Sequence, residues 1–181
     1  QSLGKYVRLR KNFKGKKKTY HTDSALPNYS PEELLKFLNS DSVESKKKYD
    51  IFISHSYLDK DLVKSMKNTL NFQNLSCYYD WTSDQDFLKR NLISGYTKEV
   101  LKKRIEQSKA LILVLTHNVI ADGEITSEWI KMEIEHAKSV GKKICCLNFT
   151  DLGHQFINIE FQYEGNSISI SKNGVQLLTN L

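Results

Sequence analysis

The chain has 181 residues, of which 39% are apolar and 10% aromatic, and it carries a formal net charge of +6 at pH 7. This composition supports one domain with a buried core and argues against a disordered chain. No run of 18 apolar residues occurs, which excludes a membrane-spanning helix, and the N-terminus lacks the apolar stretch of a secretory signal.

The positive charge is concentrated at the start of the chain. Residues 1–18 contain eight Lys or Arg and no acidic residue, so the remaining residues have a net charge of −2. Such an arm can contact nucleic acid or anionic lipid, or it can simply be solvated. The solvated arm is favoured because no set of interleaved aromatic residues accompanies the charge. We therefore expect neither nucleic-acid nor membrane binding.

A short helix is predicted next, before a linker. Ser30 is suited to the N-cap position, Pro31 to the first helical position, and Glu33 completes a capping box. Leu34 and Leu35 begin an apolar face, so this helix should dock on another element. Residues 40–48 are polar or charged except for Val43, a composition that is typical of a linker. We therefore predict a basic arm and docking helix over 1–48 and a separate domain over 49–181.

From residue 49 the pattern alternates between apolar runs and amphipathic segments. The predicted elements are a strand at 49–54, a helix at 59–72, a strand at 75–81, a helix at 95–107, a strand at 110–116, a helix from 127 to Gly141 and a strand at 142–149. This alternation predicts right-handed βαβ units on a parallel sheet. The domain core is thus 49–150, and the β-prone segment 151–181 is expected to add a fifth strand or an edge hairpin, with turns at 164–166 and 173–174.

Three cysteines form no disulfide framework, and no CxxC pattern or histidine cluster indicates a metal site. Cys77 and the neighbouring Cys145 and Cys146 lie in apolar runs. We expect them to be buried free thiols in a reducing, cytoplasmic setting.

The helix that begins near Ser127 contains an acid on its apolar side. At 100° per residue, Ile130, Ile134, Ala137 and Val140 form the face that a packed helix buries. Glu133 lies within this face, about one turn after Trp129. A carboxylate directed at a core is costly unless it is paired or used in a site. From periodicity alone, a buried ion pair and a functional acid are both open.

Four segments, in their order and spacing, resemble a TIR (Toll/interleukin-1 receptor/resistance) domain. They are YDIFISHSYLD (49–59), LSCYYDW (75–81), IEQSKALILVLT (105–116) and SEWIKMEI (127–134). The phrase ISHSYLDKDLV is most similar to bacterial TIR proteins, such as the TIR component of Thoeris-like antiphage systems. The resemblance implies a flavodoxin-like α/β fold with a central parallel five-stranded sheet and helices on both faces.

The resemblance also implies an activity. Many TIR domains cleave NAD⁺ at the nicotinamide–ribose bond with a glutamate four residues after a Trp, and Glu133 after Trp129 matches that position. NAD⁺ would then be the substrate, with no metal or other cofactor. Ser54, His55 and Ser56 match the loop bordering the ribose and phosphates, while Asp80 and Trp81 match the BB loop beside a base. For His55, a backbone hydrogen bond is an equal alternative; for Trp81 and Trp129, it is core packing.

Three functions follow from this resemblance as hypotheses. The first is an NAD⁺-cleaving enzyme of bacterial antiviral immunity that makes a cyclic ADP-ribose-type signal or ADP-ribose. Its partners would be other TIR domains, through self-association, and a downstream effector that senses the product. The alternatives are a toxin that depletes NAD⁺ and a non-catalytic TIR–TIR scaffold.

Overall fold

The computed structural model describes residues 30–79 and 95–181. Its centre is a five-stranded sheet in the order β2-β1-β3-β6-β7, in which every pair of neighbours is parallel. The strands are β1 (Tyr49–Ser54), β2 (Cys77–Tyr78), β3 (Ser108–Leu115), β6 (Lys143–Asn148) and β7 (Ile157–Asn158). The predicted parallel five-stranded sheet is therefore confirmed.

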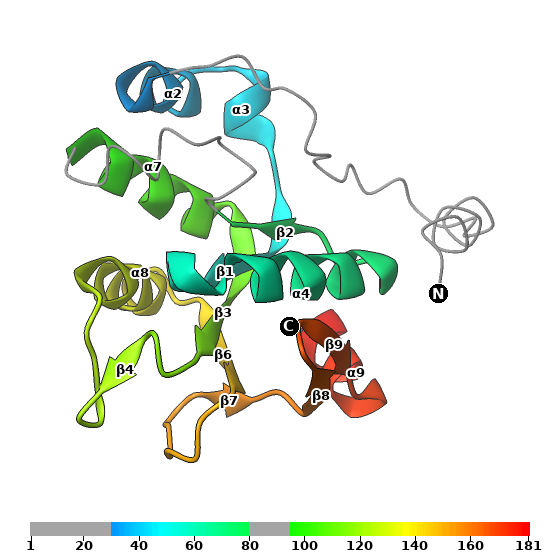
Figure 1. Cartoon of the computed structure of the whole chain (residues 1–181). Helices are drawn as coiled ribbons and strands as arrows, with labels where there is room; N and C mark the ends of the chain where they lie inside the picture. Colours follow the sequence, from blue (N-terminus) through cyan, green and yellow to red (C-terminus); the bar gives the residue numbers. More distant parts are fainter. Residues whose placement is uncertain (1–29, 80–94) are drawn as a thin grey trace.

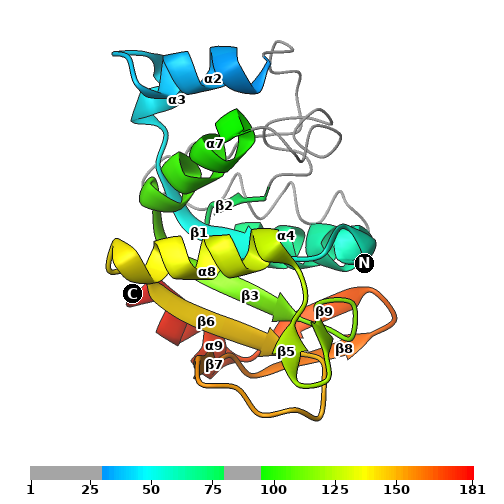
Figure 2. The ribbon, with the colours of Figure 1, turned by 90° about the vertical axis from the view of Figure 1, so that its left-hand side faces the viewer.

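Helices cover both faces of this sheet, as expected for the flavodoxin-like fold (Figures 1 and 2). One face packs against α7 (Gly95–Glu106) and α8 (Glu128–Ser139), and the other against α4 (Lys60–Phe72). Alternate residues of β3 supply both cores: Leu111, Leu113 and Leu115 on the α7/α8 side, and Ile112 and Val114 on the α4 side. Such alternation follows from the two-residue repeat of a strand.

The helix boundaries follow local signals in the sequence. In α2 (Pro31–Leu38) the predicted capping box forms, with Ser30 N donating to Glu33 Oε2 at 3.0 Å and Glu33 N donating to Ser30 Oγ at 3.2 Å. Gly141 has a φ of +71° and terminates α8 as predicted. Val140 was expected on the buried face but is 39% exposed, because the helix has already ended at Ser139.

The segment after β6 contains both of the features expected as alternatives. β7 adds the fifth strand, and β8 (Phe161–Glu164) pairs antiparallel with β9 (Ser167–Ile170) in a separate hairpin that turns at Gly165, φ +58°. The second predicted turn, at 173–174, is wrong. Ser171 caps α9 (Lys172–Thr179), and Gly174 lies inside this helix, where a Cβ would come within 3.1 Å of the Glu160 carbonyl oxygen.

A small hairpin between β3 and α8 was not predicted. It consists of β4 (Ile120–Ala121) and β5 (Glu124–Ile125), joined through Asp122 and Gly123, which both have positive φ. An Asp-Gly pair is the usual sequence signal of such a two-residue turn.

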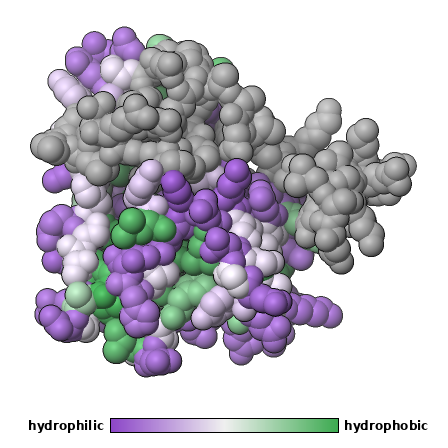
Figure 3. All heavy atoms as spheres, in the orientation of Figure 1, coloured by the Kyte–Doolittle hydropathy of each residue, from purple (hydrophilic) through white to green (hydrophobic). Residues whose placement is uncertain are grey.

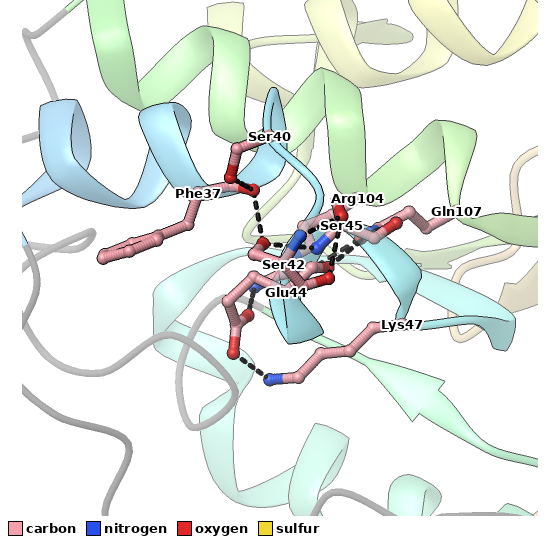
Figure 4. A network of polar contacts seen from close by, with 8 residues as sticks. All are labelled: Phe37, Ser40, Ser42, Glu44, Ser45, Lys47, Arg104 and Gln107. Carbon is pink, nitrogen blue, oxygen red and sulfur yellow. Dashed lines mark hydrogen bonds and ion pairs between the residues drawn. The ribbon is translucent and has the colours of Figure 1, made fainter.

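The N-terminal helices pack on α7. Leu34 and Leu38 of α2 form a small apolar cluster with Val100 of α7. The predicted linker contains a further short helix, α3 (Val43–Lys46), whose Glu44 is only 8% exposed. Glu44 Oε2 accepts a hydrogen bond from Arg104 Nη2 at 2.6 Å, and its Oε1 is 2.7 Å from Lys47 Nζ (Figure 4).

Arg104 is the fully buried centre of this network. Its guanidinium lies over the rings of Tyr49 and Tyr78, at 5.9 and 5.5 Å from the ring centroids, and donates to Gln107 Oε1 at 2.9 Å. Gln107 in turn donates to the Glu44 carbonyl at 2.8 Å (Figure 4). A buried guanidinium needs such partners, because an uncompensated charge in the interior is strongly destabilising.

The three cysteines are buried free thiols, as predicted. Cys145 packs in the α4-side core and Cys146 in the α7/α8-side core. Burial raises the pKa of the Cys145 thiol to about 11 and that of Cys146 to about 12. Among residues 30–79 and 95–181, no helix is long and apolar enough to cross a bilayer.

We expect Glu44→Ala to lower the free energy of unfolding by about 3–5 kcal/mol, because it leaves the buried Arg104 without its carboxylate. Urea denaturation monitored by circular dichroism measures this. The matched control is Asp41→Ala, which removes the exposed Asp41–Lys46 ion pair and should leave the transition midpoint unchanged. Equal effects of the two substitutions would contradict the importance of the buried pair.

The raised thiol pKa values predict that stability falls as the pH rises above about 9. The unfolded thiols ionise near their ordinary pKa of 9.0, whereas the folded ones stay protonated up to about pH 11 and 12. Rising pH therefore favours the unfolded state through these groups. Urea titrations between pH 8 and 10.5 should show a smaller decrease in a Cys145→Ala/Cys146→Ala variant than in the parent chain.

Candidate functional site

Glu133 is a buried acid on the second turn of α8. The helix begins at an N-cap, Ser127, whose Oγ accepts a hydrogen bond from Ile130 N at 3.4 Å. From there, Ile130, Ile134 and Ala137 pack into the sheet, and Glu133 lies among them with 7% exposure. The placement inferred from helical periodicity is therefore what the structure has: this carboxylate faces inward.

Trp129 precedes Glu133 by one turn and is half-buried. Its ring packs against the α7/α8-side core, and Lys98 Nζ lies 5.7 Å from the ring centroid. Lys98 belongs to the first turn of α7, so the beginning of α7 lies beside Trp129. This arrangement includes the core packing that was the alternative for Trp129, although the residue as a whole is not fully buried.

Ser54 lies on the same face of the sheet as Glu133. It ends β1 and pairs in register with Leu113 of β3. Two residues earlier, Phe52 packs in the α7/α8-side core, so strand alternation directs Ser54 to that side. Ser54 is fully buried, and its hydroxyl has no hydrogen-bond partner among the described residues. A buried hydroxyl in this state is costly unless another group binds it.

His55 and Ser56 have different surroundings. His55 Nδ1 lies 3.2 Å from the Ile53 carbonyl, and its ring meets Tyr79 edge-on with centroids 6.1 Å apart. Tyr79 packs in the α4-side core, which places His55 on the opposite side of the sheet from Glu133. Ser56 Oγ accepts a hydrogen bond from Leu58 N at 3.3 Å and begins the short helix η1 (Tyr57–Asp59). Asp80 and Trp81 lie outside the described residues.

One polar network at this end of the sheet was not singled out from the sequence. Asp59, the last residue of η1, accepts hydrogen bonds from Thr116 Oγ1 at 2.6 Å and from Asn118 Nδ2 at 2.7 Å. These residues follow β1 and β3, which are neighbours in the sheet. Polar side chains after adjacent parallel strands meet at one edge of the sheet; this rule points to Thr116 and Asn118, whereas Asp59 lies five residues beyond the end of β1.

The carboxyl ends of the strands also carry exposed apolar side chains. Tyr57 and Leu58, which follow β1, are 53% and 72% exposed, and Leu152, which follows β6, is 41% exposed. Figure 3 looks onto this end of the sheet and shows apolar groups interspersed with hydrophilic ones.

Within the described ranges, no group of three or more His, Cys, Asp or Glu is arranged to hold a metal ion.

A buried carboxylate can stabilise a positive charge that develops close to it. In a water-poor environment this interaction is stronger than at the surface. Glu133 has the required burial, and Trp129 offers an aromatic surface one turn away. The arrangement is suited to a reaction whose transition state is cationic.

The sequence profile of the family described as "Thoeris protein ThsB, TIR-like domain" matches residues 52–152. The chain belongs to this family. The match begins in β1 and ends after β6, so it contains Ser54, the Asp59 network, Trp129 and Glu133. The resemblance noted from the four sequence segments is thereby confirmed.

Similar proteins extend the comparison. The chain is 45% identical over 170 residues to "Putative cyclic ADP-D-ribose synthase TIR2" of Cytobacillus dafuensis, an alignment covering 93% of this chain and 44% of that protein. It is 28% identical over 139 residues to "Probable 3' cyclic ADP-D-ribose synthase ThsB'" of Bacillus cereus (strain MSX-D12), covering 77% of this chain and 67% of that protein. It is 23% identical over 145 residues to the protein Toll of Drosophila melanogaster, covering 12% of that protein. The chain thus spans less than half the length of the Cytobacillus relative.

Replacing Ser54 by Ala should leave stability unchanged or raise it, because the substitution removes a buried hydroxyl that lacks a partner among the described residues. Ser76→Ala is the matched control: Ser76 is also buried, but its Oγ accepts from Asp50 N at 2.9 Å and donates to Asp50 Oδ2 at 3.1 Å. Ser76→Ala should cost about 1–3 kcal/mol. Thermal melting of both variants measures the change in stability. A large loss of stability in Ser54→Ala would contradict the conclusion that its hydroxyl lacks a partner among the described residues.

Proposed function

We propose that this chain cleaves NAD⁺ at the nicotinamide–ribose bond and forms a cyclic ADP-ribose-type product or ADP-ribose. The observation that carries the proposal is the buried Glu133, one turn after Trp129 on the helix that follows β3. The family and the names of two relatives, both called cyclic ADP-D-ribose synthases, support the same reaction.

Glu133 would act on charge that develops during bond breakage. When nicotinamide leaves, positive charge grows on the ribose ring in an oxocarbenium-like state, as in glycoside cleavage. A fixed anion beside C1′ and the ribose hydroxyls lowers the energy of that state most when water is excluded. Nicotinamide departs as a neutral molecule without needing a proton. A single carboxylate is therefore sufficient for this step, and NAD⁺ is the substrate rather than a cofactor.

Other residues would bind the substrate. The Ser54 hydroxyl lies on the same face of the sheet as Glu133 and lacks a partner among the described residues, so a ribose hydroxyl or phosphate oxygen would satisfy it. Trp129 offers a ring face for stacking. His55, Ser56, Asp80 and Trp81 stay predicted substrate-binding residues from the family resemblance; of these, His55 faces Tyr79 on the α4 side.

The wider setting belongs to the same proposal. A TIR protein of this family would work in the cytoplasm as part of bacterial antiviral immunity, associate with other copies through TIR–TIR contacts, and pass its product to an effector that senses the nucleotide. Self-association would complete the site, so activity should rise with protein concentration.

We expect Glu133→Gln to reduce NAD⁺ cleavage by about 100- to 1,000-fold, the loss usually caused by removing one electrostatic contact to a transition state. Glu135→Gln is the matched control, because Glu135 lies two residues away on the exposed side of α8. The assay incubates each protein with NAD⁺ at several protein concentrations and resolves nicotinamide, ADP-ribose and cyclic isomers by chromatography.

The products separate the alternatives. A cyclic product supports a signal-producing enzyme, whereas linear ADP-ribose with rapid loss of NAD⁺ supports a depleting toxin. If the chain shows no turnover at any concentration and Glu133→Gln leaves its cellular effect intact, the enzymatic proposal is wrong and a TIR–TIR scaffold is favoured.

A further inference from the structure

The Asp59 carboxylate is directed away from its own helix. Asp59 occupies the N-cap position of α4, where an Asp usually accepts a hydrogen bond from the first helical turn, yet it makes no such bond. Its side chain is instead buried, at 8% exposure, and both oxygens are used across the sheet end: Oδ2 by Thr116 Oγ1 at 2.6 Å and Oδ1 by Asn118 Nδ2 at 2.7 Å. The carboxylate thus joins the start of α4 to the end of β3.

Thr116 extends this set of hydrogen bonds into the segment before α8. Its Oγ1 donates to Asp59 and also accepts from Asn118 N at 3.2 Å, so the hydroxyl is used in both directions. The Thr116 carbonyl accepts from Val119 N at 3.0 Å. Val119 is fully buried, which fixes this short turn against the core.

The connection then crosses the base of the β4–β5 hairpin. The Val119 carbonyl accepts from Thr126 N at 3.0 Å and from Thr126 Oγ1 at 3.2 Å. The next residue, Ser127, is the N-cap of α8. Hydrogen bonds therefore connect Asp59 to Thr126, the residue immediately before the N-cap of the Trp129–Glu133 helix.

We propose that Asp59 is a positioning residue that fixes the start of α8 and thereby the place of the Glu133 carboxylate. This inference rests on the proposed function for its effect on catalysis. Hydrogen bonds to an ionised carboxylate are stronger than neutral ones, and burial shields these two from water. A displacement of about 1 Å at a reacting group can cost on the order of 100-fold in rate, so the position of α8 has a direct kinetic consequence.

The test removes the hydroxyl that Asp59 holds while keeping the side-chain shape. Thr116→Val should lower kcat for NAD⁺ cleavage by about 10- to 100-fold and change KM by less than about twofold, because substrate contacts are intact and only the transition-state geometry is disturbed. Thr116→Ser keeps the hydroxyl and should restore kcat. Asp61 is an exposed acid in the first turn of α4. Asp61→Asn is therefore the matched control and should leave kcat and KM unchanged.

A measurement without substrate tests independently whether the hydrogen bonds from Asp59 to Thr126 hold the segment before α8. In wild-type protein the amides of Val119, Thr126 and Ile130 are hydrogen-bonded along the connection. Hydrogen exchange followed by NMR should be faster at these amides in Thr116→Val, with amides of β6 unchanged. If Thr116→Val does not fold, Asn118→Ala removes only the second bond to Asp59 and carries the same expectations with smaller changes.

The outcomes separate this inference from the proposed function. Faster exchange with a lower kcat supports the positioning role. Unchanged hydrogen exchange overturns the inference that Asp59 holds the segment before α8. Faster exchange with unchanged kcat overturns the role of Asp59 in positioning Glu133. A wild-type chain that does not cleave NAD⁺ overturns both the proposed function and the kinetic role of Asp59. The exchange data still decide whether Asp59 holds residues 116–126.

Discussion

The parallel pairing of β1 with β3 is the constraint on which the arrangement of this molecule depends. The register that sets Ser54 opposite Leu113 brings the ends of both strands to one edge of the sheet. Because parallel strands leave the sheet in the same direction, the loop before α4 and the connector before α8 must then lie side by side. Asp59 can reach Thr116 only for this reason, and Ser54 shares a face with Glu133 for the same reason. A shift of one residue in this register would turn every side chain of β1 to the opposite face.

The second constraint is the pair of layers stacked on one side of the sheet. α8 packs on the strands, α7 packs beside it, and α2 with α3 packs on α7 (Figure 2). The outermost layer lies before the family match, which begins at residue 52, yet its Glu44 partners a fully buried arginine. The alignment with the Cytobacillus relative covers 93% of the chain and therefore includes most of this segment. The division of the chain at residue 48 stays a prediction, and the contacts of α2 and α3 show how closely the two parts pack.

Sequence patterns predicted well those elements whose burial is simple. β1 was placed correctly at both ends because all six of its residues are buried and most of them are apolar. α8 was placed within a residue or two because Ser127 and Gly141 mark its ends. The inward direction of Glu133 followed from helical geometry alone. Its role did not, since periodicity cannot distinguish a buried ion pair from a functional acid, and the functional role of Glu133 stays a prediction from the family resemblance.

The failures have physical causes that a single sequence does not display. Asn173-Gly174 has the composition of a turn, but the Ser171 cap and the lack of space at Gly174 place it in a helix. Glu44 and Lys47 look like solvated linker residues, and only the distant Arg104 makes them interior groups. For Glu44 and Lys47, a long-range contact overrides the local preference.

The adjacent cysteines of β6 have a consequence for oxidation. Because successive side chains of a strand point to opposite faces, Cys145 and Cys146 lie in different cores although they are neighbours in the chain. Their Cβ atoms therefore point apart, and a disulfide between them would require β6 to abandon its extended conformation and its pairing with β3 and β7. An oxidant gains access to these sulfurs only when the sheet opens. Oxidation at this strand would consequently report loss of the fold, and it could not serve as a reversible switch within the folded domain.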